Sequence, residues 1–234
     1  RGRAAGVGDA PPSRGLRRGR RRHPVGPGGA ARRDAVRAKL VELLMPQLKN
    51  DPAAAETEAE AFLELGQKQT GLLVERGEGW FGFFHPTFKE YLAARACVLA
   101  GQLSLDKTWA VLQKHLDDAL WREVILLTVG YKAIIQSEQE AAAYLIEHIA
   151  AEPDCRLEAW GGNVVLAGRC LVDIGHGGVT EDCWDAVMTQ LVPIMQNQPE
   201  SLNYSIPTRY AAAEILDRLG WLPFDLDVFV KIPY

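Results

Sequence analysis

Residues 71–94 read GLLVERGEGWFGFFHPTFKEYLAA, and this stretch decides how the rest of the chain is interpreted. Residues 72–74 form a short apolar run, and residues 80–84 form a second run that is rich in aromatic side chains. Gly77 and Gly79 stand between the two runs, where a glycine adopts positive φ without steric cost. The pattern therefore predicts two short strands joined by a turn.

A helix is predicted directly after the second strand. Pro86 suits the first turn of a helix, because the N–H that proline lacks would bond to nothing there. Phe88, Tyr91 and Leu92 then recur at spacings of three and four residues, which places them on one helical face. The strand pair thus leads straight into an amphipathic helix.

Two further helices are predicted ahead of the strand pair. An amphipathic pattern covers residues 35–48, and Asp51 and Pro52 suit the N-cap and first turn of a helix over residues 53–69. Residues 35–100 therefore read as helix, helix, strand, strand, helix. This order predicts a small winged-helix-like unit with a two-stranded β-wing.

After residue 100 the chain reads as helices joined by short polar or glycine-rich breaks, without a strand signal. The expected helices cover residues 104–115, 119–133, 137–149, 156–174 with an interruption at Gly161-Gly162, 181–195 and 208–219. Glu140 stands where it would complete a capping box with Ser137. We interpret residues 101–222 as an antiparallel helical-repeat array of the HEAT or armadillo kind, which makes the chain mainly α.

Composition bounds the class of protein and its compartment. The chain of 234 residues is 47% hydrophobic, which suffices for a sizeable core. Its apolar runs are too short to span a bilayer, and its start does not read as a secretory signal. The cysteines lack the spacing of a disulfide framework or a zinc site; they are Cys97, Cys155, Cys170 and Cys183. We therefore expect a cytoplasmic protein with buried thiols and no metal.

The net charge of −4 hides an asymmetry along the chain. Residues 1–33 contain ten arginines and one acidic residue, Asp9, whereas the remainder has 16 basic and 29 acidic residues, a net charge of −13. The arginine-rich stretch is crowded with glycine and proline and lacks aromatic residues, so it cannot bury enough surface to fold. We expect residues 1–34 to form a disordered tail rather than a nucleic-acid-binding arm.

The stretch from residue 71 to residue 94 also resembles a known family. It matches the signature F-x-H-x-T-F-x-E-Y-x-x-A, which closes the nucleotide-binding region of bacterial NACHT-type STAND signalling NTPases. The matching residues are Phe83, His85, Thr87, Phe88, Glu90, Tyr91 and Ala94. In that family a histidine of the winged-helix region contacts the β-phosphate of bound ADP and holds a closed state. The resemblance implies that His85 is this sensor, latent in this chain, or a structural neighbour of it. The residues alone favour a histidine that links the strand to the helix start by hydrogen bonds.

Later segments are similar to the same family. Residues 121–127, WREVILL, resemble the segment that opens the helical region after NACHT modules, with Trp121 as its first residue. Residues 209–220 resemble the helix that closes this region. Residues 227–233 look like the first strand of a formylglycine-generating-enzyme-like (sulfatase-modifying-factor) domain. The resemblance implies that residues 223–234 lead into such a domain and that the parent protein is longer.

The sequence offers no catalytic motif. A nucleotide hydrolase of this class needs G-x-x-x-x-G-K-[ST] after a strand, and the glycine-rich stretches 26–29 and 175–178 lack the lysine. A G-x-S-x-G elbow is also missing, and Cys97 falls late on a helix, where its pKa would not drop. We expect no catalytic residue and no cofactor in this chain, with ATP or ADP bound only by the intact parent.

Three functions remain. The first is a regulatory, sensor-linking part of a NACHT-type NTPase, which couples binding of a partner or ligand to a nucleotide-dependent switch. The second is a free-standing helical-repeat scaffold that binds proteins. The third, a DNA-binding winged helix, is disfavoured because residues 53–69 contain four glutamates against one lysine, Lys68. We expect proteins or the nucleotide-binding module as partners, and neither nucleic acid nor a membrane.

Overall fold

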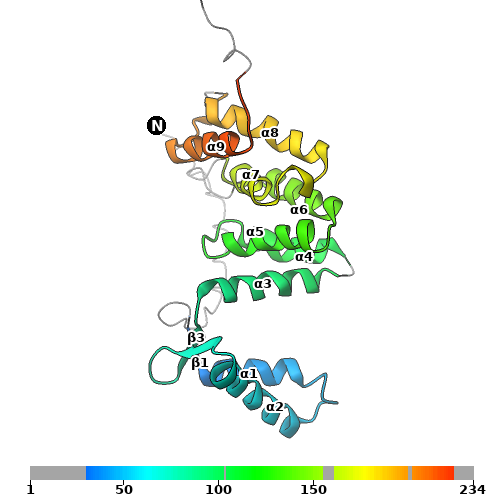
Figure 1. Ribbon diagram of the computed structural model, residues 1–234, viewed down its shortest axis with the longest axis vertical. Helices are drawn as coiled ribbons and strands as arrows, with labels where there is room; N and C mark the ends of the chain where they lie inside the picture. The colour runs from blue at the N-terminus through cyan, green and yellow to red at the C-terminus, as the bar shows by residue number, and fades with distance from the viewer. Residues whose placement is uncertain (1–29, 103, 155–160, 200–201, 224–234) are drawn as a thin grey trace, which may run out of the picture. The chain divides into compact units, whose positions relative to one another are not determined.

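The computed structural model describes residues 30–102, 104–154, 161–199 and 202–223 (Figure 1). These residues are mainly α-helical and include one small antiparallel sheet, as the sequence predicts. The chain divides into two compact units, one ending at Phe84 and the other beginning at His85. The boundary expected from the sequence lies after residue 100. In the structure, the helix over residues 86–100 packs with the later helices, so the boundary lies before it.

The described part of the first unit, from residue 30, starts with a short strand and two helices. These are β1 (Ala31–Arg32), α1 (Arg33–Leu44) and α2 (Pro52–Glu64), which continues as a π-helical turn over Leu65–Gln69. The Asp51 carboxylate accepts hydrogen bonds from the backbone N–H groups of Ala53 and Ala54, at 3.0 and 3.2 Å. This geometry confirms the predicted N-cap and fixes the start of α2.

The wing of the first unit is a three-stranded antiparallel sheet. β2 (Leu73–Glu75) and β3 (Trp80–Phe83) form the predicted hairpin. Gly77 and Gly79 adopt positive φ angles of 116° and 69° in the turn, so a residue with a Cβ would be strained at either position. β1 pairs with the free edge of β3, which gives the strand order β1-β3-β2.

The third strand corrects the prediction of a two-stranded wing. Ala31 and Arg32 lie within the segment 1–34 that the sequence analysis assigns to a tail; its residues 1–29 lie outside the described part of the chain. A strand of two residues has no side-chain periodicity that would reveal it. Backbone pairing makes the contact, with Ala31 opposite Phe81 and Arg32 opposite Trp80.

Ion pairs connect α1 to the acidic surface of α2. Arg33 pairs with Glu60, and Arg37 pairs with Glu56 at 3.0 Å. Because these side chains are partly exposed, each pair contributes only about 0–1 kcal/mol. The glutamates that argue against DNA binding therefore also serve to hold the two helices together. The unit's buried apolar side chains are Ala30, Ala55, Ala59, Leu63 and Phe81.

The second unit contains seven α-helices among its described residues. They are α3 (Pro86–Ala100), α4 (Leu105–Leu112), α5 (Arg122–Gly130), α6 (Gln139–Ala151), α7 (Gly162–Ile174), α8 (Glu181–Gln196) and α9 (Ile206–Arg218). Short 3₁₀ and π-helical turns extend α4 over Gln113–His115 and α5 over Tyr131–Ile135. In the described part of the chain, every helix is too short or too polar to cross a membrane.

The seven helices stack in two layers. α3, α5, α7 and α9 pack in succession in one layer, and α4, α6 and α8 pack in succession in the other (Figure 1). Consecutive helices also pair across the layers, most extensively α6 with α7 and α8 with α9. The largest fully buried side chains include Leu112, Ile125, Leu145, Ile146, Ile149, Leu171, Leu191 and Leu216. Assignment of this stack to the HEAT or armadillo kind remains a prediction.

The predicted capping box of Ser137 with Glu140 is wrong. α6 begins at Gln139 with Glu138 at the N-cap position, and Ser137 adopts a positive φ of 55°. Glu138 instead accepts a hydrogen bond from Nζ of the buried Lys132, at 2.9 Å. A buried ammonium needs a charged partner, so this pair determines how the chain enters α6.

Three cysteines lie in the core of the second unit. Cys97, Cys170 and Cys183 are buried free thiols on α3, α7 and α8. Burial raises the pKa of the Cys183 thiol to about 12, and it also raises the pKa values of Cys97 and Cys170. Because the thiolate is the reactive form, these surroundings make the thiols inert. The prediction of buried thiols is confirmed for these three, and Cys155 lies outside the described residues.

Candidate functional site

His85, the predicted nucleotide sensor, occupies the N-cap position of α3. Its Nδ1 accepts a hydrogen bond from the backbone N–H of Thr87 at 3.3 Å and lies 2.9 Å from the Thr87 hydroxyl oxygen. In a neutral imidazole, an accepting Nδ1 leaves the proton on Nε2. Among the described residues Nε2 has no hydrogen-bond partner. The exposed ring thus caps the helix with one nitrogen and presents a donor with the other.

Helix α3 has one buried face and one exposed apolar face. Ala94 and Cys97 are buried against the rest of the second unit. On the other side, Phe88, Tyr91 and Leu92 retain 43, 42 and 45% of their accessible surface. Exposed large apolar side chains that gather on one helix are typical of a protein-binding surface.

The remaining signature residues occupy structural positions in different elements. Phe83 ends β3 in the first unit, and Glu90 is half-buried on α3. Trp121 precedes α5 and stacks on His115, with ring centroids 3.7 Å apart and an interplanar angle of 3°. The structure therefore brings His85, Phe88 and Tyr91 together on α3 but places Trp121 on a separate element.

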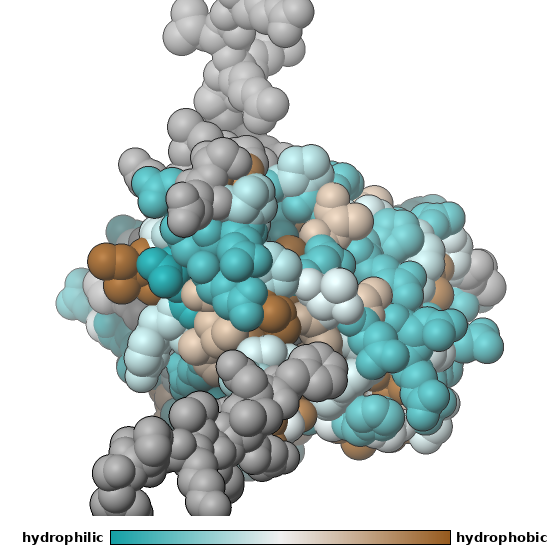
Figure 2. Space-filling view, turned by 90° about the horizontal axis from the view of Figure 1, so that it is seen from above, coloured by the Kyte–Doolittle hydropathy of each residue, from teal (hydrophilic) through white to brown (hydrophobic). Residues whose placement is uncertain are grey.

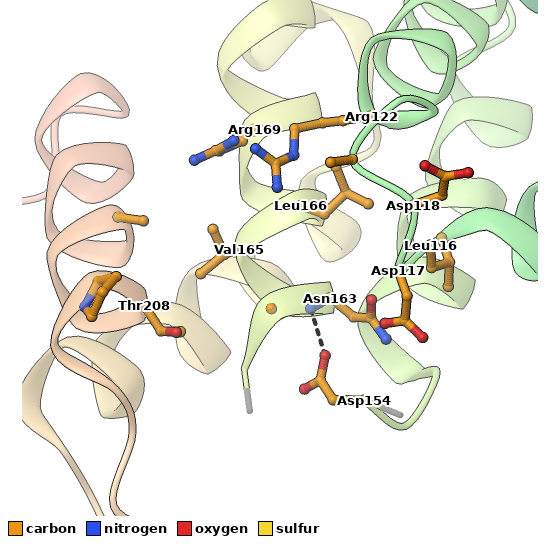
Figure 3. A pocket seen from close by; sticks show the side chains of 14 residues that line it. Leu116, Asp117, Asp118, Arg122, Asp154, Asn163, Val165, Leu166, Arg169 and Thr208 are labelled. Atoms are coloured by element: carbon orange, nitrogen blue, oxygen red, sulfur yellow. Dashed lines mark hydrogen bonds between the residues drawn. The ribbon is translucent and has the colours of Figure 1, made fainter. Parts of the chain in front are cut away.

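A pocket of about 300 Å³ opens between α5, α7 and α9 in the second unit (Figure 3). Arg122 of α5 and Arg169 of α7 lie on one side of it, and Asp117 and Asp154 lie at the opposite end. Apolar side chains that line the pocket include Leu116, Val165, Leu166 and Ala211, and the polar residues Asp118, Asn163 and Thr208 line it as well. The pocket therefore has a cationic end and an acidic end, with both apolar and polar side chains in its lining.

Asp154 holds the start of α7. Its carboxylate accepts hydrogen bonds from the backbone N–H groups of Gly161 at 2.7 Å and Asn163 at 3.0 Å. The Asn163 side chain donates to the backbone carbonyl of Glu152 at 2.8 Å. Burial raises the pKa of Asp154, and the nearby negative charge of Asp117 adds to this effect, while the N–H donors partly offset it.

The raised pKa of Asp154 predicts a pH dependence of stability. The folded state binds this proton more tightly than the unfolded state, so stability falls as pH rises from the ordinary pKa of 3.8 through the folded-state pKa. We expect the wild-type protein to lose more stability across this window than an Asp154→Asn variant. Urea unfolding at closely spaced pH values measures the difference; parallel curves for the two proteins would contradict it.

This pocket could not be predicted from the sequence. The helix expected over residues 156–174, with an interruption at Gly161-Gly162, includes Arg169. α7 begins at Gly162, after Gly161 with a positive φ of 79°, which agrees with that interruption; residues 155–160 lie outside the described ranges. The acidic pair Asp117-Asp118 close before Trp121 is visible in the sequence, but by itself it does not indicate a pocket. The arginines and aspartates meet through tertiary packing, which no local spacing encodes.

Comparison with known proteins identifies the N-terminal part of the chain. Residues 29–97 match the family model described as the winged helix-turn-helix domain C-terminal to NACHT. None of the curated proteins and none of the solved structures matched the chain. The match starts just before β1 and ends within α3, so it includes the third strand of the wing. Residues 29–97 therefore form a winged-helix domain of the kind that lies C-terminal to NACHT.

Proposed function

We propose that the chain is a non-catalytic regulatory part of a NACHT-type signalling NTPase, in which the helical array couples binding of a partner or ligand to a nucleotide-dependent switch. The observation that carries this proposal is the match of residues 29–97 to the winged-helix domain associated with NACHT. Such a domain is not itself catalytic, so nucleotide chemistry belongs to the NACHT module.

The exposed face of α3 supports docking onto the NACHT module. Phe88, Tyr91 and Leu92 together offer an apolar surface on the helix that leads into the array. The face seen in Figure 2 is mainly hydrophilic with apolar patches, and α9 also exposes two large apolar side chains, Ile206 and Tyr210. Burial of a large apolar side chain contributes about 1.5–3 kcal/mol, so the α3 face suits a partner that is bound and released.

His85 supplies the proposed link to the nucleotide. An imidazole whose Nδ1 caps α3 has Nε2–H free to donate to a phosphate oxygen of ADP in the docked module. The cap positions the ring and selects its tautomer, so helix start and nucleotide contact are coupled through one side chain. ADP would then stabilise the docked state, because it binds this state more tightly than the undocked state.

A His85→Asn variant separates the two roles of this residue. Asparagine is a good N-cap, so the variant chain should keep its thermal stability, but its short amide does not reach where the imidazole Nε2 lies. We expect ADP to dissociate about tenfold faster from the complex of the variant with a NACHT module, since a hydrogen bond to a charged group is lost. Dissociation of a fluorescent ADP measures this; an unchanged rate would remove His85 from the nucleotide site.

The direct test of the proposed function is to measure binding of the full chain to a NACHT nucleotide-binding module. The module to use is the one whose gene lies nearest to the gene of this chain. Calorimetric titration is performed with the module loaded with ADP and, separately, with a non-hydrolysable ATP analogue. We expect tighter binding to the ADP form. Equal affinity for both forms would favour the free-standing scaffold, and absence of binding to either form would overturn the NACHT-linked role.

A further inference from the structure

Two arginines, Arg122 and Arg169, line one side of the pocket of the second unit. Arg122 is exposed at the start of α5 and Arg169 is half-buried on α7, and their guanidinium groups point toward the same side of the pocket (Figure 3). Within the described residues, neither guanidinium has a carboxylate within ion-pair distance. Two guanidinium groups on one side of a pocket are suited to hold a carboxylate or phosphate by hydrogen bonds.

The opposite end of the pocket carries negative charge. Asp117 and Asp118 both line the pocket; Asp118 accepts a hydrogen bond from the backbone N–H of Leu120, and the charge of Asp117 raises the pKa of Asp154. Asp154 is already occupied by the N–H groups at the start of α7. Of these three carboxylates, Asp117 makes no hydrogen bond or ion pair to another described residue, so it remains available to a cationic group of a ligand.

Charge and size together select the class of ligand. A phosphate group with two negative charges would satisfy the arginines but would be repelled by Asp117 and Asp154. A ligand with one carboxylate and one ammonium group complements both ends. Val165 and Leu166 lie between these ends and offer apolar contact. A volume of about 300 Å³ is at the small end of ligand pockets, so it suits a small molecule.

We propose that this pocket binds a free amino acid with an apolar side chain. Its carboxylate lies on Arg122 and Arg169, its ammonium group faces Asp117, and its side chain rests on the floor formed by Val165 and Leu166. The site joins three helices of one layer, so its occupation ties α5, α7 and α9 together. The inference does not rest on the NACHT-linked function, because the site is built within the second unit.

Titration of the full chain with L-leucine, L-isoleucine, L-valine, L-methionine and L-phenylalanine tests this inference. We expect at least one of them to bind saturably at millimolar or lower concentration. The amide of that amino acid lacks the carboxylate, and its N-acetyl derivative lacks the ammonium group. Each should bind at least tenfold more weakly. Absence of saturable binding by all five amino acids would overturn the inference.

Variants of the two ends test the placement of the ligand. Arg169→Gln and Asp117→Asn should each weaken binding at least tenfold, whereas Arg218→Gln, at an exposed arginine of α9 outside this pocket, should leave it unchanged. Circular dichroism shows whether each variant is folded. If inorganic phosphate bound as tightly as the amino acid, or Asp117→Asn had no effect, the site would be a simple anion site and the inference would be wrong.

Discussion

A Leu145→Ala variant is expected to lose about 2–5 kcal/mol of unfolding free energy. Leu145 lies on α6, is fully buried and belongs to the core between the two helical layers. Its truncation removes buried apolar surface and leaves a cavity in a stack whose helices cannot fully collapse onto it. Urea unfolding followed by far-ultraviolet circular dichroism measures the loss.

Leu120→Ala is the matched control for this variant. Leu120 has 74% of its surface exposed and lies in the turn before α5, so its truncation should change stability by less than about 0.5 kcal/mol. A much larger loss of unfolding free energy in Leu145→Ala than in Leu120→Ala supports the two-layer core. If both variants unfolded at the same urea concentration as the wild-type protein, the packing of α6 described above would be wrong.

A Phe88→Ala/Tyr91→Ala double variant is expected to weaken binding to the ADP-loaded NACHT module by about 2–4 kcal/mol, on the order of 30- to 1,000-fold in Kd. Aromatic side chains at an interface commonly account for most of its affinity, and these two supply the exposed aromatic surface of α3. Calorimetric titration with the purified variant gives the change in Kd.

Tyr210→Ala is the control for the docking variant. Tyr210 lies on α9 and is 72% exposed, so it tests whether loss of any exposed aromatic ring has the same effect. We expect its Kd to match that of the wild-type chain. Equal binding by the α3 double variant and the wild type would show that the module docks elsewhere.

The parts of the fold that the sequence predicted well are those set by local chemistry. Gly77 and Gly79 specify the wing turn through positive φ, and Asp51 caps α2 through its own backbone neighbours. Pro86 begins α3 as expected. In each case the determining interaction lies within a few residues, so its signal is visible in the sequence itself.

The parts that the sequence missed depend on distant partners. β1 forms because Ala31 and Arg32 pair with the edge of β3, which lies about fifty residues later in the chain. α6 begins after Glu138 and not at Ser137, and Glu138 pairs with the buried Lys132 of the preceding helical turn. Arg169 reads as one residue of an amphipathic helix, and only packing places it beside the pocket shared with Asp117. Such contacts between separate elements leave no periodic pattern.

The rate of ADP release is the most direct test of the proposed regulatory role. If the chain binds the ADP-loaded module more tightly than the empty one, then by linkage the chain must also strengthen ADP binding. We predict that adding the full chain to a NACHT module preloaded with fluorescent ADP slows ADP dissociation, and that His85→Asn removes most of this effect. An unchanged dissociation rate at chain concentrations that saturate the module would contradict the account.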